Sequence, residues 1–454
     1  MARFTGALLA VATLLIAPPV WAQVETSSEV AAARALAESG DVAGAIVAYL
    51  TAATSLLAAE KIDEAAAAAE AAMALARSRY GDAAPELVRP LGALARLRQQ
   101  QGRYPDALGL LDQALKAGST GPADPLQEAQ LRYDQAKAYD ALGRNEDTEA
   151  AAWTSYDLRR HYLGPVQEKT ADALNLYANA LSAQGRHAEA DPAYRQVLGM
   201  YEVLYGPKDF HLAIVLSNLG NSLRRTGRGR QANPLYRRAV AVAEVSGNKV
   251  LLAQCLTNYG WYLHTQGDGA KSEAQFRRAL VLAVEVAGPE HPFTGVVHAN
   301  IGYALSDQGR FAEAEAAFAL GLRLLEAGLG PGSPDIVETL SGYAMVLAAL
   351  DRPVEAEPLF RRAAAITTTR LAPAHPDTLG ESNRFAGFLL AQDRPAEALA
   401  GLRASLAALI GREGTDAIGG GRDWRTSVRG AGPLFERRVE ASWRLAMLEP
   451  AAAP

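Results

Sequence analysis

The sequence predicts an all-α fold in which about nine pairs of helices follow one another along the chain. Hydrophobic residues make up 49% of the 454 residues but aromatic residues only 7%, and alanine is abundant. That composition favours closely packed helices over sheets. A turn signature recurs about every 42 residues, and small residues stand at a fixed distance before each turn. A period of this length is typical of a repeat protein that stacks its units in a row.

Charge and cysteine content exclude several classes of protein. The chain has 45 basic and 50 acidic residues, a net charge of -5, so it lacks the basic excess with which proteins neutralise nucleic-acid phosphates. Cys255 is the only cysteine, which excludes an internal disulfide and a cysteine-rich zinc cluster. We expect no cofactor, and no transmembrane segment in the mature chain, because no later segment is apolar over 18 uninterrupted residues.

The first 22 residues are expected to be a cleaved signal peptide. Arg3 is followed by an apolar run over residues 7–17, and the small residues Val20 and Ala22 fit a cut after Ala22. The run is too short to span a bilayer, which needs about 20 residues. We therefore expect a mature protein that begins at Gln23 and is periplasmic or secreted.

Residues 23–80 are expected to form degenerate, alanine-rich capping helices over 29–39, 43–58 and 61–79. Glu60 stands 42 residues before the next turn glycine, Gly102, with the small residues Ala53 and Ala72 in register. This spacing predicts a ninth, capping unit.

Residues 81–410 hold eight clear repeats. The central residue of each turn is Gly or Asp, as the left-handed position after a helix prefers. These residues are Gly102, Gly143, Gly185, Gly227, Gly267, Gly309, Asp351 and Asp393. Gly-Pro loops such as Gly206-Pro207 and Gly330-Pro331 separate the repeats, because Pro blocks continuation of a helix.

Small residues mark where the two helices of a repeat should cross closely. Seven residues before each turn stand Ala95, Ala136, Ala178, Gly220, Gly260, Gly302, Ala344 and Ala386. Nine residues after it stand Leu111, Ala152, Tyr194, Tyr236, Phe276, Phe318, Phe360 and Leu402. Close crossing needs small residues, and one large side chain per repeat then fills the gap to the next repeat.

Several segments carry a resemblance to a known family. They are Ala312 to Phe318, Glu355 to Ala363, and Gly288 to Pro292 together with Asn300 to Leu305. The pattern resembles tetratricopeptide repeats of the kinesin-light-chain type and covers roughly residues 40–410. The resemblance implies a right-handed α-solenoid whose concave groove is lined by the first helix of each pair. It does not imply one function.

The C-terminal region differs in composition. Glycines recur over residues 411–432, which we expect to be a flexible linker. Residues 433–454 are expected to form a helix and a tail. We favour a helix that caps the last repeat; alternatively, the segment resembles the link between such repeats and a caspase-like CHAT protease domain in bacterial proteins. The sequence contains no such domain, so no catalytic His and Cys pair is inferred.

No catalytic motif stands out, so we expect a protein that is not an enzyme. Residues 227–232 match a dinucleotide-binding pattern but follow a helix rather than a strand, and are better explained as a turn. His291 and His375 precede Pro in two loops, where local capping is more plausible than metal binding. Cys255 has no positive neighbour in sequence to lower its pKa, which favours a structural thiol.

The predicted groove carries amides, arginines and aromatic residues on one stripe of the first helices. An Asn side chain donates and accepts, so it can hold an extended peptide backbone; the open alternative is that these residues bond between neighbouring helices. Arg224 and Arg225 have no acidic residue between positions 210 and 243, which favours an acidic ligand. The candidate groove residues are Asn175, Asn179, Asn218, Asn221, Arg224, Arg225, Asn258, Trp261, Asn300 and Tyr303.

Three functions compete. The first, which we favour, is an exported scaffold that binds a protein or peptide partner in its concave groove. The second is a regulatory arm for a separately encoded or lost caspase-like effector. The third, a periplasmic hydrolase, has no residues to support it. Arginine pairs on the second helices, from Arg237-Arg238 to Arg361-Arg362, are expected to form a solvated outer face.

Overall fold

The computed structural model describes residues 28–122, 124–370, 376–416, 436–442 and 444. Every regular element in these ranges is helical. The chain forms two compact units, residues 1–207 and 208–454, and each is described by itself. The expected signal peptide lies outside the described residues.

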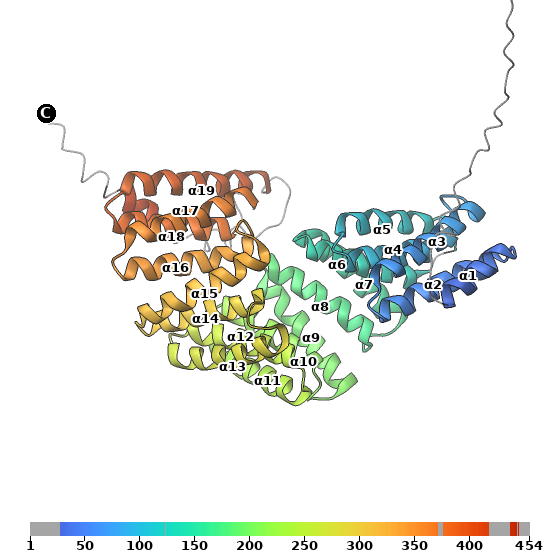
Figure 1. Ribbon diagram of the computed structural model, residues 1–454, viewed down its shortest axis with the longest axis horizontal. Helices are drawn as coiled ribbons and strands as arrows, with labels where there is room; N and C mark the ends of the chain where they lie inside the picture. Colours follow the sequence, from blue (N-terminus) through green and yellow to red (C-terminus); the bar gives the residue numbers. More distant parts are fainter. Residues whose placement is uncertain (1–27, 123, 371–375, 417–435, 443, 445–454) are drawn as a thin grey trace, which may run out of the picture. The chain divides into compact units, whose positions relative to one another are not determined.

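The first unit is a row of antiparallel helices, stacked in sequence order (Figure 1). A short 3-10 helix, Pro85–Leu87, precedes α4. The helices are α1 (Ser28–Glu38), α2 (Val42–Ala58), α3 (Ile62–Tyr80), α4 (Val88–Gln100), α5 (Tyr104–Gly118), α6 (Pro125–Ala141), α7 (Asn145–Tyr162), α8 (Glu168–Ala183) and α9 (His187–Tyr205). The three helices expected before residue 80 are confirmed as α1, α2 and α3.

The second unit continues the same alternation of first and second helices. Its helices are α10 (His211–Arg225), α11 (Gly229–Ser246), α12 (Lys249–Thr265), α13 (Gly269–Ala287), α14 (Pro292–Asp307), α15 (Phe311–Leu329), α16 (Val337–Ala349), α17 (Pro353–Arg370), α18 (Pro376–Ala391) and α19 (Pro395–Asp416). A 3-10 helix, Pro334–Ile336, precedes α16. Since α19 continues to Asp416, residues 411–416 are helical and do not belong to the linker that the glycines predicted.

The turns have the backbone that their residues predicted. All eight central residues have positive φ, including Asp351 at 59° and Asp393 at 56°. Glu60, the expected turn of the ninth unit, also has positive φ, at 61°. After α14, the amide of Arg310 donates to the carbonyl of Leu305 at 3.0 Å, which ends the helix in the usual left-handed cap.

The predicted packing of a large side chain against small residues, where two helices cross, is confirmed in the second unit. Phe318 is fully buried, and a Cβ added at Gly302 would lie 2.7 Å from its ring. A Cβ at Gly342, in the next first helix, would lie 2.6 Å from the same ring. One aromatic side chain therefore fills the space inside its own repeat and between that repeat and the next.

Within each unit, a first helix contacts the first helix of the next repeat. In the second unit these pairs run from α10 and α12 to α16 and α18, and in the first unit from α2 and α4 to α6 and α8. Second helices make no comparable contacts with one another in the described part of either unit. First helices therefore lie on the inner side of each curved stack, as the resemblance implied.

The helical residues 436–442 and 444 dock on the last repeat. Ala441 is fully buried in the core formed by α16 to α19, and Arg444 donates to the carbonyl of Leu390 at 2.8 Å. Arg437 packs over Gly387, where an added Cβ would overlap its guanidinium.

The docked helix occupies the place of one more first helix. In the repeat of α12 and α13 the residue after the small crossing residue faces the next first helix: Trp261 packs on Tyr303 at 5.1 Å between ring centroids. Gly387 has the same register after Ala386, and Arg437 lies over it. This arrangement agrees with the capping interpretation of the C-terminal helix.

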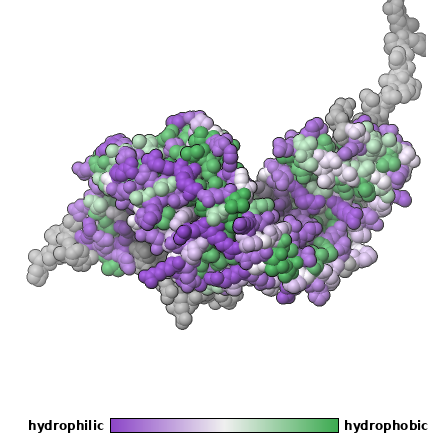
Figure 2. Space-filling view, turned by 90° about the horizontal axis from the view of Figure 1, so that it is seen from below, coloured by the Kyte–Doolittle hydropathy of each residue, from purple (hydrophilic) through white to green (hydrophobic). Residues whose placement is uncertain are grey.

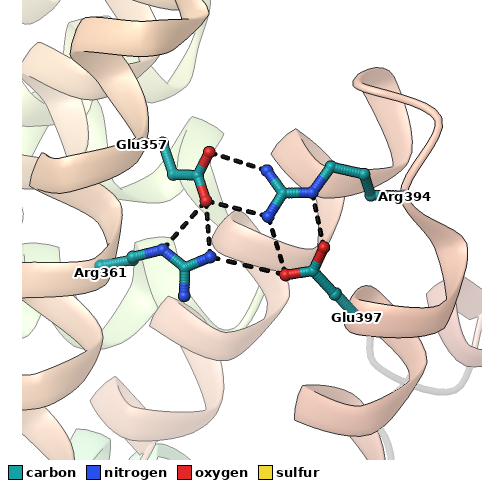
Figure 3. Close-up of polar contacts among 4 residues, drawn as sticks. All are labelled: Glu357, Arg361, Arg394 and Glu397. Carbon is teal, nitrogen blue, oxygen red and sulfur yellow. Dashed lines mark hydrogen bonds and ion pairs between the residues drawn. The ribbon is translucent and has the colours of Figure 1, made fainter.

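Ion pairs join neighbouring repeats at the turns. Arg394, just after a turn, donates to Glu397 in its own repeat and to Glu357 in the preceding second helix, each at 2.7 Å (Figure 3). Arg361 donates to Glu357 at 2.6 Å, so the four side chains form one network. These hydrogen bonds lower the pKa of both carboxylates. Of this arginine pair, Arg361 is exposed as expected, whereas Arg362 is half-buried and donates to the carbonyl of Pro331 at 2.6 Å.

The face in Figure 2 is mostly hydrophilic, with hydrophobic residues in small separate areas. None of the described helices combines the length and the apolar character needed to cross a bilayer.

Candidate binding site between α10 and α12

A pocket of about 220 Å³ opens on the first-helix side of the second unit, between α10 and α12. Asn218 and Asn258, from equivalent positions of successive repeats, both line it, as does Gln254. The remaining lining residues are Ile214, Ser217, Leu251, Cys255, Thr257 and Phe293. The structure thus brings together two of the ten candidate residues around a largely apolar floor.

The pocket suits an uncharged group. Its lining contains three carboxamides and no charged side chain. An engineered cavity of about 150 Å³ holds benzene, so 220 Å³ is enough for a side chain the size of leucine or phenylalanine. The amides can hold a peptide backbone while an apolar side chain enters the pocket.

Cys255 lies in the floor of this pocket and is 2% exposed. Burial raises the pKa of its thiol to about 11, so the thiol is protonated at neutral pH. Ser217 donates to its Sγ at 3.7 Å, which links α10 to α12 below the pocket. The structural thiol expected from the sequence is confirmed.

Asn179 and Asn221 have a role inside their own repeats. The hydroxyl of Tyr194 donates to Asn179 at 2.8 Å, and that of Tyr236 donates to Asn221 at 2.7 Å. Each pair joins the first helix of a repeat to its second helix. These two residues therefore have the alternative role that the sequence left open: they form hydrogen bonds between neighbouring helices.

The pairing has a sequence signal that the motif analysis missed. Each Asn stands directly after the small crossing residue and 15 residues before the Tyr. Where the second helix carries Phe276 or Phe318 instead, the corresponding first-helix residue is Trp261 or Tyr303.

Asn300 and Tyr303 were expected to be exposed, and that expectation is wrong. Their exposed fractions are 4% and 8%. Tyr303 donates to the backbone oxygen of Glu338 in α16 at 2.6 Å, and burial is the main cause that raises its pKa. The Asn300 Nδ2 atom is buried without a partner among the described residues. Packing against α16 removes the room that an isolated α14 would leave for a ligand.

Asn175 is out of register with the other asparagines. It stands three residues before the small residue Ala178, whereas Asn218 and Asn258 stand two before theirs. Leu176 occupies the equivalent position. One residue rotates a helical side chain by about 100°, so Asn175 lies off the stripe that Asn218 and Asn258 share.

Of the two arginines, Arg225 is exposed at the end of α10 and Arg224 is half-buried. Burial raises the pKa of Tyr236 to about 12, and the nearby Arg224 opposes that rise through charge and a hydrogen bond. The Nε atom of Arg224 is buried and has no partner in the described ranges. Arg225 is therefore the arginine that a ligand on this face would meet.

Side chains tie the later first helices together across the inner face. His264 in α12 binds Asp307 in α14 at 2.5 Å, and Trp261 packs on Tyr303. Glu338 in α16 accepts from Arg384 in α18 at 2.9 Å. Side-chain contacts thus bridge the first helices from α12 to α18, whereas the space between α10 and α12 holds the pocket.

The first unit has a buried charged cluster that the sequence analysis missed. Asp134 in α6 is 2% exposed and accepts from Arg96 at 3.2 Å and Gln130 at 3.0 Å. Burial raises its pKa. Arg159, 3% exposed, donates to Gln130 at 3.0 Å and lies 4.5 Å above the Tyr133 ring. These residues bind one another and stabilise the contact between helices.

The sequence did contain a signal for this cluster: Asp134 stands in the register of the groove residues. Asp134 stands two residues before Ala136, just as Asn218 stands two before Gly220. The position that carries the pocket-lining Asn218 and Asn258 in the second unit therefore carries a buried carboxylate in this repeat of the first.

No three His, Cys, Asp or Glu side chains lie close enough to hold a metal ion in the described part of the chain. The ring of His291 accepts from the amide of Phe293 at 3.1 Å, so the expected local cap is confirmed there. His375 lies outside the described residues.

Comparisons with known proteins agree with this architecture. Profiles of the tetratricopeptide repeat match residues 44–118, 211–280, 262–327 and 297–369, and two further profiles of the same repeat match 93–156 and 170–211. No curated protein matches the chain.

Solved structures of similar fold include the apo form of the quorum sensor NprR from B. thuringiensis, at 16% identity and a TM-score of 0.55 over 71% of this chain and 88% of that one. Aspartyl phosphate phosphatase F from Bacillus subtilis aligns at 14% identity and a TM-score of 0.53, over 76% and 85%. BtubC (BKLC) from P. vanneervenii aligns at 24% identity and a TM-score of 0.43, over 50% and 92%. The matched repeats cover more than half of the sequence, and the chain belongs to the tetratricopeptide repeat family.

Proposed function

We propose that this chain is an exported, non-catalytic scaffold that binds a protein or peptide partner on the first-helix face of its second unit. The observation that carries the proposal is the α10–α12 pocket, where Asn218, Gln254 and Asn258 surround an apolar floor. Extended peptides present both apolar side chains and unpaired backbone groups, and this site offers a partner for each.

The ligand should also carry a carboxylate. Arg225 is exposed seven residues after Asn218 on α10, which is about 10 Å along a helix. An extended chain covers that distance in about three residues. A peptide with an apolar residue in the pocket and an acidic group about three residues away would satisfy both.

The test is a comparative capture of partners from the periplasmic fraction. Wild type and the variant Asn218→Ala/Asn258→Ala are used as baits, with Gln231→Ala, an exposed amide on α11, as the matched control. We expect a protein that wild type and the control retain and the double variant loses, with the helical circular dichroism unchanged. Equal retention by all three would contradict binding at this pocket.

Export is part of the same proposal and rests on residues 1–22. The mature protein should begin at Gln23 in the periplasm or the medium. An intact Met1 in a cytoplasmic fraction, found by N-terminal sequencing, would contradict it.

A regulatory arm for a separate caspase-like effector is the second candidate. That function is best served by a C-terminal helix left free for the effector. Ala441 is fully buried and Arg444 binds the Leu390 carbonyl, which favours the cap instead. The solved relatives of this fold include a quorum sensor and a phosphatase, so the fold itself does not choose a function.

A further inference from the structure

A second and larger cavity, of about 560 Å³, lies in the last repeat, away from the α10–α12 pocket. It opens between the second helices α17 and α19, and α18 forms its floor. Thr368, Gly401 and Ala404 are exposed at its mouth, whereas Thr378 and Leu389 are buried below. The other lining residues are Ala364, Ser382, Phe385, Ala386, Glu397, Ala398 and Ser405.

The cavity exists because large side chains of the preceding repeat are missing. A shift of 42 residues superimposes the two repeats in sequence. It aligns Leu322 with Ala364, Ile336 with Thr378, Leu340 with Ser382, and Leu359 with Gly401. The four aliphatic residues belong to or pack against the core of their repeat, so the same space is filled there. Four replacements at one place make this a feature of the last repeat rather than of the fold.

Gly401 does not serve close packing, unlike the crossing glycines. A Cβ built on Gly401 meets no atom within 4 Å, whereas one built on Gly302 would lie 2.7 Å from an aromatic ring. Gly401 therefore borders open space rather than a packed contact.

The interior is apolar with a few hydroxyl groups. The Phe385 ring, Leu389 and Ala398 supply the apolar surface. Ser405 donates to Ser382 at 2.7 Å, and Ser382 donates to the carbonyl of Thr378 at 2.9 Å, so each hydroxyl oxygen can still accept a hydrogen bond.

Charge is confined to the rim of the cavity. Glu397, the only charged side chain in the lining, is exposed and accepts from Arg394 at 2.7 Å. A charged ligand would lose its hydration without gaining a partner inside.

We propose that this cavity binds a neutral small molecule with an apolar body and one or two hydroxyl or amide groups. The apolar body fills the space between α17 and α19, and its polar group donates to Ser382 or Ser405. The volume lies in the range of about 300–1,000 Å³ that small-molecule sites occupy. The proposal is independent of peptide binding at the α10–α12 pocket.

The test restores the residues of the preceding repeat in the full chain. Ser382→Leu/Gly401→Leu fills the cavity, and Ala400→Leu, exposed on the same helix, is the matched control. The probes are 2-phenylethanol and cyclohexylmethanol, with phenylacetate and phenethylammonium as charged counterparts of similar size. Binding is measured by titration calorimetry and by the melting temperature.

We expect the two alcohols to bind wild type saturably, with one molecule per chain, and to raise its melting temperature. The charged counterparts should bind at least tenfold more weakly. The filled variant should melt at a higher temperature without any probe and lose the alcohols at least tenfold in affinity, while Ala400→Leu keeps wild-type affinity.

Three results would overturn the proposal. They are no saturable binding of either alcohol, unchanged binding in the filled variant, and a crystal structure in which the chain's own residues occupy the cavity. The higher melting temperature expected of the filled variant separates loss of the site from loss of the fold.

Discussion

Two groups of repeats fill the same crossing point in different ways. In the repeats of α8–α9 and α10–α11 the second helix carries a tyrosine, and its hydroxyl binds an asparagine in the first helix. In those of α12–α13 and α14–α15 the second helix carries Phe276 or Phe318, and an aromatic residue, Trp261 or Tyr303, takes the place of the asparagine.

The difference teaches how to separate binding residues from packing residues in such a chain. In these four repeats the residue after the small crossing position matches the ring 15 residues later: an amide accompanies a tyrosine hydroxyl, and an aromatic ring accompanies a phenylalanine. In the following repeat Met345 stands 15 residues before Phe360. Asn179 and Asn221 are therefore packing residues, because each accepts a hydrogen bond from the tyrosine inside its own repeat. Asn218 and Asn258 stand at another register, two residues before the small position, and line a pocket.

The largest effect is expected from removing the ring of the phenylalanine group. Phe318 is fully buried against Gly302 and Gly342, so Phe318→Ala should lower the free energy of unfolding by roughly 3–5 kcal/mol. Urea unfolding measures it, with Phe210→Ala, an exposed phenylalanine, as the control. An equal decrease in the free energy of unfolding in both variants would mean that the Phe318 ring does not stabilise this helix crossing.

Overpacking the same crossing should cost less. A side chain at residue 302 has no room beside the Phe318 ring, so Gly302→Leu should destabilise by roughly 1–3 kcal/mol. Gly199→Leu is the matched control, because Gly199 is helical and an added Cβ there meets nothing within 4 Å. The control should be neutral or slightly stabilising in thermal and urea melts; a loss at both glycines would point to the backbone rather than to the crossing.

The tyrosine group should respond at its hydroxyl. Tyr236→Phe removes one hydrogen bond to Asn221 and should cost roughly 0.5–1.5 kcal/mol. Asn221→Ala should cost a similar amount, and the double variant less than the sum, because both changes remove the same bond. Strict additivity in urea unfolding would show that the two residues do not interact.

The tyrosine group should also show a difference in alkaline stability. Burial raises the pKa of Tyr236 to about 12 from an ordinary value of 10. Its contribution to stability is fully present below pH 10 and is lost as the pH rises toward 12, since the folded state holds the proton more tightly. Between pH 10 and 12 wild type should therefore lose stability more steeply than Tyr236→Phe in urea titrations; parallel curves would contradict a buried hydroxyl.

Much of the fold could be predicted because its information is local and repeated. Gly309 and Asp351 adopt the left-handed backbone that a turn needs, and they do so at the predicted spacing. Gly302 and Phe318 meet because the period places them on facing helices. A repeat contacts mainly its neighbours, so eight copies of one pattern determine the stack and leave little to long-range contacts.

The site could be predicted only in part, because exposure is a property of neighbouring helices rather than of one helix. Asn218 and Asn300 have the same register, yet the first lines a pocket and the second is buried. Nothing within either helix distinguishes them. The neighbouring first helices decide it, since their packing leaves a pocket between α10 and α12 but buries Asn300 and ties α14 to α16 through Tyr303.

The sequence by itself determined an all-helical repeat architecture, its turns and its crossing residues, because each depends on residues at fixed short spacings. Only the tertiary structure decided which amides remain accessible, where Asp134 and Arg159 are buried together, and that Ala364, Ser382 and Gly401 border one cavity. Those outcomes depend on how much volume three or four separate helices leave between them, and that volume is set when the helices pack against one another.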